Sequence, residues 1–289
     1  MLGVAATAAA IAGCPLFGPS FTTNQRVDRL PVAAGSDAIV RSIGLDDTFH
    51  ADFGSGRWEG SPIGIPYTVV SRKTHRSKVQ FDYAGESDRG RYPIPSGVKI
   101  EGGGDRHALL VDRSRCRLYE LYALRRENGR WSAGSGATWN LRRFKARPRG
   151  WTSADAAGLP ILPLLARPGK APIRHALRVT VAESRSAFVW PARHQASDRS
   201  DPSLPRMGER LRLKRSVDIA RFPRQARRIA KAMQTYGLIV ADNGTDMYVS
   251  GTMDPVWDND VLNPAFHGLD ADDFEVLKRG WGQPVIGVP

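Results

Sequence analysis

The sequence lacks most of the features by which common protein classes are recognised. It has only 2 cysteines in 289 residues, too few for the disulfide framework of a small secreted domain. It contains no Gly-Lys-Ser/Thr phosphate loop, no Gly-x-Ser-x-Gly nucleophile elbow, no paired-histidine zinc helix, no Cys-x-x-Cys pair and no EF-hand loop. These absences remove the simplest sequence support for nucleotide-binding, serine-hydrolase and zinc-peptidase activities. After the first residues, no apolar stretch approaches the ~20 residues of a transmembrane helix.

The composition is that of a globular protein with many turns. The hydrophobic share of 41% and the charged share of 25% are ordinary, and the 29 glycines and 20 prolines follow no collagen-like period. The sequence shows no internal repeat and no convincing linker between domains. We therefore expect a single β-rich domain at residues 21–289, after a leader at residues 1–20.

The chain carries a large positive charge without an obvious basic cluster. Its formal net charge is +13 and its pI is about 10.2, but the basic residues are mostly arginines scattered from Arg26 to Arg279. A strong nucleic-acid site needs a contiguous basic patch. The pattern thus favours a generally cationic surface with no nucleic-acid partner, and it slightly favours an acidic polysaccharide as substrate or partner.

The first residues point to export. Residues 2–13 are an uninterrupted run of apolar and small residues, too short for a membrane span and typical of a signal-peptide core. The run ends in Ile-Ala-Gly-Cys, which resembles the lipobox of bacterial lipoproteins, so we expect Cys14 to carry a lipid that anchors the chain to a membrane and Cys116 to lack a cysteine partner. No Lys or Arg precedes Arg26, and we expect the true start codon upstream. The sequence predicts an extracytoplasmic protein; a buried apolar helix with an ordinary cysteine is the alternative.

Short alternating runs predict a mostly-β fold. The clearest unit is a hairpin in which residues 107–111 and 117–121 flank a turn at residues 112–115. Short strands separated by turn residues are typical of a β-sandwich or jelly-roll-like single domain, which is the fold we expect. Further strands are expected at residues 62–70, 79–83, 176–181, 187–190, 210–213, 238–241 and 247–250.

One clear helix is expected near residues 222–236. Its apolar residues recur at helical spacing, Pro223 suits the first turn, and Gly237 stands where the helix should end. A shorter helix is expected at residues 35–43. The other face of the longer helix is basic, and solvent is a commoner partner for such a face than phosphate groups; this face carries Arg224, Arg227, Arg228 and Lys231.

Polar residues gather where the hairpin begins. Residues 101–107 read Glu-Gly-Gly-Gly-Asp-Arg-His, which places Asp105, Arg106 and His107 beside an apolar strand. Glu120 lies on the returning strand among apolar residues. A buried carboxyl group there would have the raised pKa of a general acid, whereas on a half-exposed sheet it would simply point to solvent.

Two later segments each carry an acid that suits either a site or a turn. Asp155 is the single acid in residues 151–160, next to Trp151, and it either faces a substrate or caps a turn. Asp242 lies in the segment 241–246, where Asn-Gly predicts a tight hairpin turn. A sugar hydroxyl or Ca²⁺ is the alternative partner of Asp242.

The histidines leave two interpretations open. His175 and His194, the latter next to Arg193, are isolated in the sequence, and isolated histidines are more often structural than functional. Together with His107 and a carboxylate such as Glu120, they would suit a metal or acid–base site, because imidazole serves both roles.

Six segments share a pattern that spans nearly the whole chain after the leader, namely residues 50–54, 92–95, 101–122, 150–163, 188–197 and 236–251. They resemble a family of secreted bacterial proteins of unassigned activity. The resemblance implies export, one domain and a shared fold, and it assigns no reaction, cofactor or catalytic residue.

The function that we expect is that of a secreted carbohydrate-active enzyme, a glycoside hydrolase or a polysaccharide lyase. A hydrolase needs an acid and a base or nucleophile about 5–10 Å apart; Glu120 and Asp155 are the first pair and Asp105 the reserve. A lyase would use a base such as His107, His175 or Tyr119, with an arginine to neutralise a uronate. The residues expected to contact substrate are His175, His194, Arg106, Arg193, Trp151 and Asp242, and no metal or cofactor is expected.

Two other functions remain open. One is a non-catalytic cell-surface module that binds an anionic polysaccharide. The other is a metal-dependent enzyme that uses the three histidines.

Overall fold

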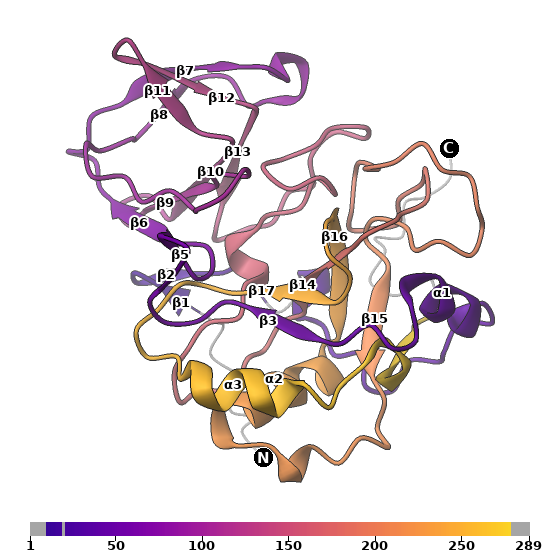
Figure 1. The fold of residues 1–289 in the computed structure, drawn as a ribbon. Helices are drawn as coiled ribbons and strands as arrows, with labels where there is room; N and C mark the ends of the chain where they lie inside the picture. Colours follow the sequence, from indigo (N-terminus) through magenta and orange to yellow (C-terminus); the bar gives the residue numbers. More distant parts are fainter. Residues whose placement is uncertain (1–9, 19–20, 279–289) are drawn as a thin grey trace, which may run out of the picture.

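β-Strands dominate the computed structural model, which describes residues 10–18 and 21–278 (Figure 1). Strands make up 29% and helices 16%, in several sheets with 3 helices. The predicted mostly-β single domain is confirmed. None of the helices in the described ranges has the length and apolar content needed to cross a bilayer.

The chain forms its strands and helices in the following order. The strands are β1 (Ala10–Ile11), β2 (Cys14–Pro15), β3 (His50–Asp52), β4 (Arg57–Trp58), β5 (Ser61–Pro62), β6 (Tyr67–Val70), β7 (Ser77–Phe81), β8 (Arg91–Tyr92), β9 (Ala108–Asp112), β10 (Arg117–Tyr122), β11 (Arg125–Glu127), β12 (Arg130–Ala133), β13 (Ser135–Asn140), β14 (Leu177–Val181), β15 (Arg210–Leu213), β16 (Leu238–Asn243), β17 (Tyr248–Ser250) and β18 (Phe274–Val276). The helices are α1 (Ser36–Ile43), α2 (Arg224–Thr235) and α3 (Asn259–Phe266).

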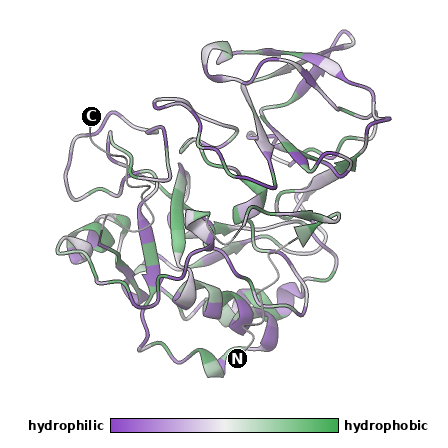
Figure 2. Cartoon of the chain, turned by 180° about the vertical axis from the view of Figure 1, so that it is seen from behind, coloured by the Kyte–Doolittle hydropathy of each residue, from purple (hydrophilic) through white to green (hydrophobic). Residues whose placement is uncertain are grey.

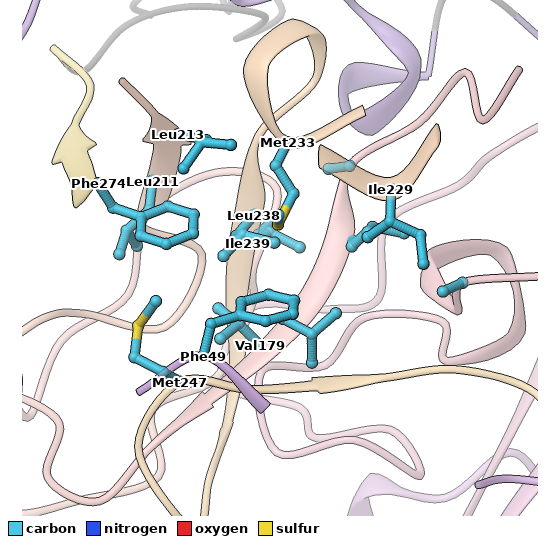
Figure 3. Close-up of a cluster of buried hydrophobic side chains, with 14 of the residues drawn as sticks. Phe49, Val179, Leu211, Leu213, Ile229, Met233, Leu238, Ile239, Met247 and Phe274 are labelled. Carbon is cyan, nitrogen blue, oxygen red and sulfur yellow. The ribbon is translucent and has the colours of Figure 1, made fainter. Parts of the chain in front are cut away.

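A six-stranded sheet organises the larger part of the molecule, with the order β18-β15-β16-β14-β17-β3. Its central strands β14 and β16 run parallel and are almost wholly buried, which fits their runs of Leu, Ile and Val. Figure 3 shows side chains of α2, such as Ile229 and Met233, facing Leu238 and Val179 of these strands. The sheet and the helices thus share one core, and in Figure 2 the central strands are largely hydrophobic whereas the helices at the bottom carry both kinds of residue.

The two helices expected from the sequence are present. α2 buries Ala226, Ile229, Ala230 and Met233 as the spacing predicts, and Gly237 follows it with a φ of +75°. Its basic face is largely exposed, as expected of a solvated face. α3 was not among the expected helices. It contains Pro264, and the Asp258 side chain accepts a hydrogen bond from the Val261 amide and caps its N-terminus.

A second part of the molecule holds two four-stranded sheets, ordered β13-β10-β9-β6 and β11-β12-β7-β8. The predicted hairpin is confirmed as β9 and β10, with Tyr119 opposite Leu110. Both faces of the hairpin are buried: Leu109 and Leu118 belong to one core, and Leu110 and Leu121 belong to another. Because alternate residues face opposite sides of a strand, this pattern explains why the hairpin is so apolar.

The pairing of the strands differs from an antiparallel jelly roll. Four of the described strand pairs are parallel, namely β6–β9, β7–β12, β14–β16 and β3–β17. Residues 187–190 do not form a strand and contribute only an isolated bridge between Phe188 and Met207. The expected hairpin at residues 241–246 is also absent, because β16 and β17 pair with opposite edges of β14.

The N-terminal segment packs into the domain instead of standing apart as a leader. Cys14 is bonded to Cys116 in a disulfide, and Leu16 and Phe17 lie in the core beside β9, β10 and β13. The expectation that Cys116 lacks a partner is therefore wrong, and the Cys14 sulfur is not available for a lipid thioether in this structure. Residues 1–9 and 19–20 of the expected leader lie outside the described residues.

Breaking the disulfide should destabilise the protein substantially. It joins residues 102 positions apart, and a crosslink that closes a loop of this length restricts the unfolded chain strongly. We expect the Cys14→Ser/Cys116→Ser variant to lose about 2–5 kcal/mol of unfolding free energy, measured by urea denaturation. Wild type in a reducing agent should behave like the variant; equal stability of wild type and variant would contradict the pairing.

Candidate functional site

A cavity of about 420 Å³ brings together residues from distant parts of the chain. Four of the residues expected at a site line it: Asp105, Asp155, His194 and Asp242. The rest of its lining consists of Tyr83, Glu86, Tyr122, Ser135, Thr152, Ser153, Ala154, Ala156, Ala196 and Asn243.

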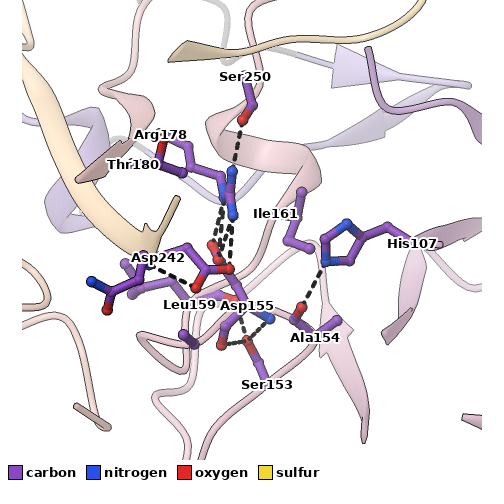
Figure 4. A network of polar contacts seen from close by, with 12 residues as sticks. His107, Ser153, Ala154, Asp155, Leu159, Ile161, Arg178, Thr180, Asp242 and Ser250 are labelled. Atoms are coloured by element: carbon purple, nitrogen blue, oxygen red, sulfur yellow. Dashed lines mark hydrogen bonds and ion pairs between the residues drawn. The ribbon is translucent and has the colours of Figure 1, made fainter. Parts of the chain in front are cut away.

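A buried arginine, which is not itself part of the lining, holds two of the lining carboxylates in place (Figure 4). Arg178 of β14 donates hydrogen bonds to both carboxylate oxygens of Asp155, from Nε at 3.1 Å and from Nη2 to Oδ1 at 3.0 Å. Its Nη2 also donates to Asp242 Oδ2 at 3.0 Å, and its Nη1 donates to the Ser250 hydroxyl at 2.7 Å. Burial lowers the pKa of Arg178, but the two carboxylates outweigh burial and raise it. The guanidinium is therefore charged and fixed in position.

The loop that carries Asp155 is held rigidly. The Ser153 hydroxyl donates to the Leu159 carbonyl at 2.6 Å and accepts from the Asp155 amide at 2.9 Å. Gly158 has a φ of +70°, and a Cβ there would lie 2.5 Å from the Trp151 carbonyl oxygen. Only glycine fits this turn without strain, so the sequence around Asp155 fixes the direction of its side chain.

Asp242 is the carboxyl group with the strongest sign of function. Its side chain is 25% exposed and lines the cavity. Burial, followed by the nearby Asp155, raises its pKa to about 7, against the opposing effect of Arg178. A carboxyl group with a pKa near neutrality can both give and take a proton at physiological pH.

A second buried ion pair lies beside the first. His107 Nδ1 is 2.5 Å from Glu101 Oε2, and His107 Nε2 is 3.0 Å from the Ala154 carbonyl oxygen. Both ring nitrogens face acceptors, so both donate and the ring is an imidazolium. Burial lowers the pKa of His107, but Glu101 outweighs burial and raises it to about 9.

The same hydrogen bonds bear on metal binding. Possible ligand atoms of Glu101, Asp105 and His107 lie within 4.8 Å of one another. A histidine binds a metal through a nitrogen lone pair, yet both nitrogens of His107 carry protons directed at oxygen atoms. The geometry therefore favours an ion pair over a metal centre at these residues.

Carboxylates outnumber cations in the polar network around Arg178 and His107. Asp155, Asp242, Glu101, Asp105 and Asp52 all interact electrostatically with one another or with Arg178. The cationic partners in this group are Arg178 and His107. The local charge is thus negative although the chain as a whole is strongly basic, and burial raises the pKa of Asp52 as well.

The remaining expected contact residues lie around the rim or outside the cavity. His194 lines it, and its Nδ1 bonds the Ala156 carbonyl at 2.9 Å. Arg193 donates to the Arg147 carbonyl and Arg106 to the Leu124 carbonyl, so both hold loops together. Trp151 lies outside the lining of this cavity and borders a different recess.

Two expected site residues are structural. Glu120 is fully buried and accepts hydrogen bonds from Trp139 Nε1 and from the amides of Ile161 and Leu162. Burial raises its pKa to about 7 against these amides, but it lies outside the lining and cannot meet a substrate there. His175 is also buried, bonded to Arg167 and the Ala176 carbonyl, and burial lowers its pKa well below the usual value.

Arg178 is the central residue that sequence reasoning missed. The signal was present, because Arg178 interrupts the apolar strand Leu-Arg-Val-Thr-Val. An arginine inside a buried strand requires carboxylate partners. Its partners could not be identified, since Asp155 and Asp242 lie on either side of it in the sequence at long distance.

Comparison with known proteins gives no relative for this chain. No protein-family model, no curated protein and no solved structure matches it. The resemblance to secreted bacterial proteins stays a prediction, and function must be argued from the site.

Removing the central arginine should destabilise the protein. The Arg178→Met variant leaves the carboxylate of Asp155 buried without a partner, which costs about 3–5 kcal/mol of stability. Urea denaturation at pH 7 measures this loss. The Arg178→Met/Asp155→Asn variant should recover part of it, and a single variant as stable as wild type would refute the central role of the ion pair.

The His107–Glu101 pair should make stability depend on pH. A histidine with a folded pKa of about 9 stabilises the fold fully below its unfolded value, near 6.5, and this stabilisation is lost as the pH rises through 9. We expect wild type to lose on the order of 3 kcal/mol between these limits. The His107→Gln variant should lose this slope in urea titrations across the range, whereas His75→Gln, at an exposed position, should keep it.

Proposed function

We propose that the chain is a glycoside hydrolase that binds a neutral or cationic sugar in the cavity, with Asp242 as its general acid. The observation that carries the proposal is the carboxyl group of Asp242, which is three-quarters buried, has a pKa of about 7 and faces the cavity. Such a group is partly protonated at neutral pH and can donate a proton to a glycosidic oxygen.

A second carboxylate of the lining would serve the other half of the reaction. Asp105 is exposed, lines the same cavity and interacts electrostatically with Asp242. Asp242 would donate its proton to the leaving oxygen, and Asp105 would act as the base for water or as the nucleophile. Asp155 and Arg178 would position Asp242 without touching substrate, which replaces the catalytic role first expected for Asp155.

The lining suits a sugar that bears no negative charge. Tyr83 is 56% exposed and Tyr122 is half-buried, so each offers an aromatic edge or face to a sugar ring. Thr152 and Asn243 add groups that can donate and accept hydrogen bonds. No Lys or Arg occurs among the lining residues of the described cavity, so a uronate carboxylate would meet carboxylates there, and this disfavours a lyase.

The disulfide supports an extracytoplasmic location. Disulfides persist in oxidising compartments and are rare in the cytosol, and Cys14 and Cys116 are paired. We therefore propose that the protein works outside the cytoplasm. Anchoring through a lipid on Cys14 is not part of this proposal.

Replacing Asp242 should abolish hydrolysis but leave binding. Purified protein is incubated with neutral and amino-sugar oligosaccharides, and new reducing ends are counted. Asp242→Asn should lower kcat by about 10²–10⁴-fold while calorimetry shows an unchanged Kd, because the amide keeps the shape but cannot donate the proton. Wild-type activity should fall as the pH rises through 7, since the acid must be protonated.

A matched control separates this role from a general loss of acid groups. Asp272→Asn changes a carboxylate that is 71% exposed and pairs with Lys214, outside the cavity lining, and it should leave kcat unchanged. Full activity of Asp242→Asn would remove Asp242 from the mechanism. Sugar binding without any turnover in wild type would leave a binding module in place of an enzyme.

A further inference from the structure

A basic groove lies on the part of the molecule that holds β8, β10 and β13, at the upper left of Figure 1. Two adjoining recesses, of about 710 Å³ and 460 Å³, share Arg76, Arg117, Tyr119 and Asn140. We call the two recesses together the basic groove. Its cationic residues are Arg76, Arg89, Arg91, Arg115, Arg117, Arg142, Arg143, Lys145 and Arg147.

The fold concentrates charge that the sequence disperses. These residues come from the segments before β7, around β8, along β10 and after β13, and only pairing of the strands brings them together. Asp88 is the acidic residue in the lining of the groove as described, and it is already bonded to Arg147 at 2.9 Å. The expectation of a diffuse cationic surface therefore needs correction at this face.

Some of the cations build the groove and others are left for a ligand. Arg147 donates to Asp88 and to the carbonyls of Glu86 and Thr152, and Arg76 donates to the Arg91 carbonyl and the Tyr119 hydroxyl. These guanidinium groups are structural.

Four exposed cationic side chains in the groove have no such structural role. Arg89, Arg117, Arg143 and Lys145 make no ion pair and no side-chain hydrogen bond with the residues that the structure describes. Like charges held close together repel one another unless an anion lies between them. Guanidinium groups also bind carboxylate, sulfate and phosphate oxygens through paired hydrogen bonds.

We infer that the basic groove binds an anionic polysaccharide, that is, a chain of sugars that bear carboxylate or sulfate groups. The groove is concave and polar and has several cations along it, which fits a polymer with repeated anionic groups better than a single small anion. Multiple weak charge contacts along one chain add to a useful affinity.

The aromatic residues of the groove favour a polysaccharide over a nucleic acid. Single-stranded nucleic acids bind by stacking bases on open aromatic faces, but Tyr92, Tyr119 and Trp139 are at most 5% exposed. Arg76 lies over the Tyr119 ring, and Arg147 lies over Trp139 and over Trp151. Trp151 is partly exposed, but Arg147 covers its ring, so the described lining offers more charge than open aromatic surface.

The groove and the cavity are neighbours with opposite charge. Arg147 connects the two sites through its hydrogen bonds. It donates to the carbonyls of Glu86 and Thr152, which line the cavity, and to the carboxylate of Asp88, which lines the groove. An anionic polymer in the groove would be repelled from the carboxylates of the cavity. The inference therefore goes beyond the proposed hydrolase and does not depend on it.

Binding of polygalacturonate tests the groove directly. Wild type is compared with Arg117→Glu/Arg143→Glu and with Arg224→Glu/Arg227→Glu, which makes the same change in net charge on the exposed face of α2. Affinity electrophoresis and calorimetry should show that the groove variant binds polygalacturonate at least about tenfold more weakly. The α2 variant should bind like wild type, and neither should bind neutral dextran.

Three outcomes would overturn the inference. Equal losses in the two variants would show that net charge alone attracts the polymer. Equal binding of dextran and polygalacturonate would show that charge is irrelevant. Tighter binding of a single-stranded oligonucleotide of matched charge would assign the groove to nucleic acid instead. Hydrolysis of neutral sugars by the groove variant remains a separate readout, so failure here is distinguishable from failure of the proposed enzyme.

Discussion

The structure depends on one buried cation. Arg178 lies at the centre of the six-stranded sheet, and its charge is balanced by Asp155 from the loop before the strand and by Asp242 from the neighbouring strand β16. A buried guanidinium without partners would be strongly destabilising, so the loop, the two strands and β17, which supplies Ser250, must come together for the fold to form. The same requirement leaves Asp242 held at the cavity with a raised pKa. Folding and the proposed chemistry are thus two consequences of one ion network.

Local sequence patterns were enough to predict several helices and strands, whereas the residues that form the candidate site were determined by contacts between distant parts of the chain. The β9–β10 hairpin, α1 and α2 follow from alternation, helical spacing and turn residues, which a single sequence displays. The Asn-Gly of residues 243–244 is a strong hairpin signal, yet β14 inserts between the flanking strands, and no local pattern can reveal an insertion by a distant strand. Likewise, Glu120 met every local criterion for a raised pKa, and its pKa is raised. Its burial behind Trp139 could not be predicted because it depends on long-range packing.

The composition of the chain gave no sign that its acidic and basic side chains are separated into an acidic cavity and a basic groove. A chain with a formal net charge of +13 surrounds a cavity with carboxylates and places a row of guanidinium groups next to it. Both arrangements bring together residues that are far apart in the sequence. The net charge and the spacing of charged residues along the chain therefore do not reveal either of them. A surface divided in this way would attract anions at the basic groove and repel them at the cavity.

The parallel pairing of β3 with β17 has a consequence for how the protein matures. Strand β3 (His50–Asp52) pairs with β17 (Tyr248–Ser250) at the edge of the six-stranded sheet. Because β17 comes about 200 residues later in the chain, the sheet cannot be completed until synthesis of the protein is nearly finished. Topologies that rely on distant pairings fold slowly. The covalent link between Cys14 and Cys116 joins segments that are both made in the first half of the chain, so it can form before the last strand of this edge is available.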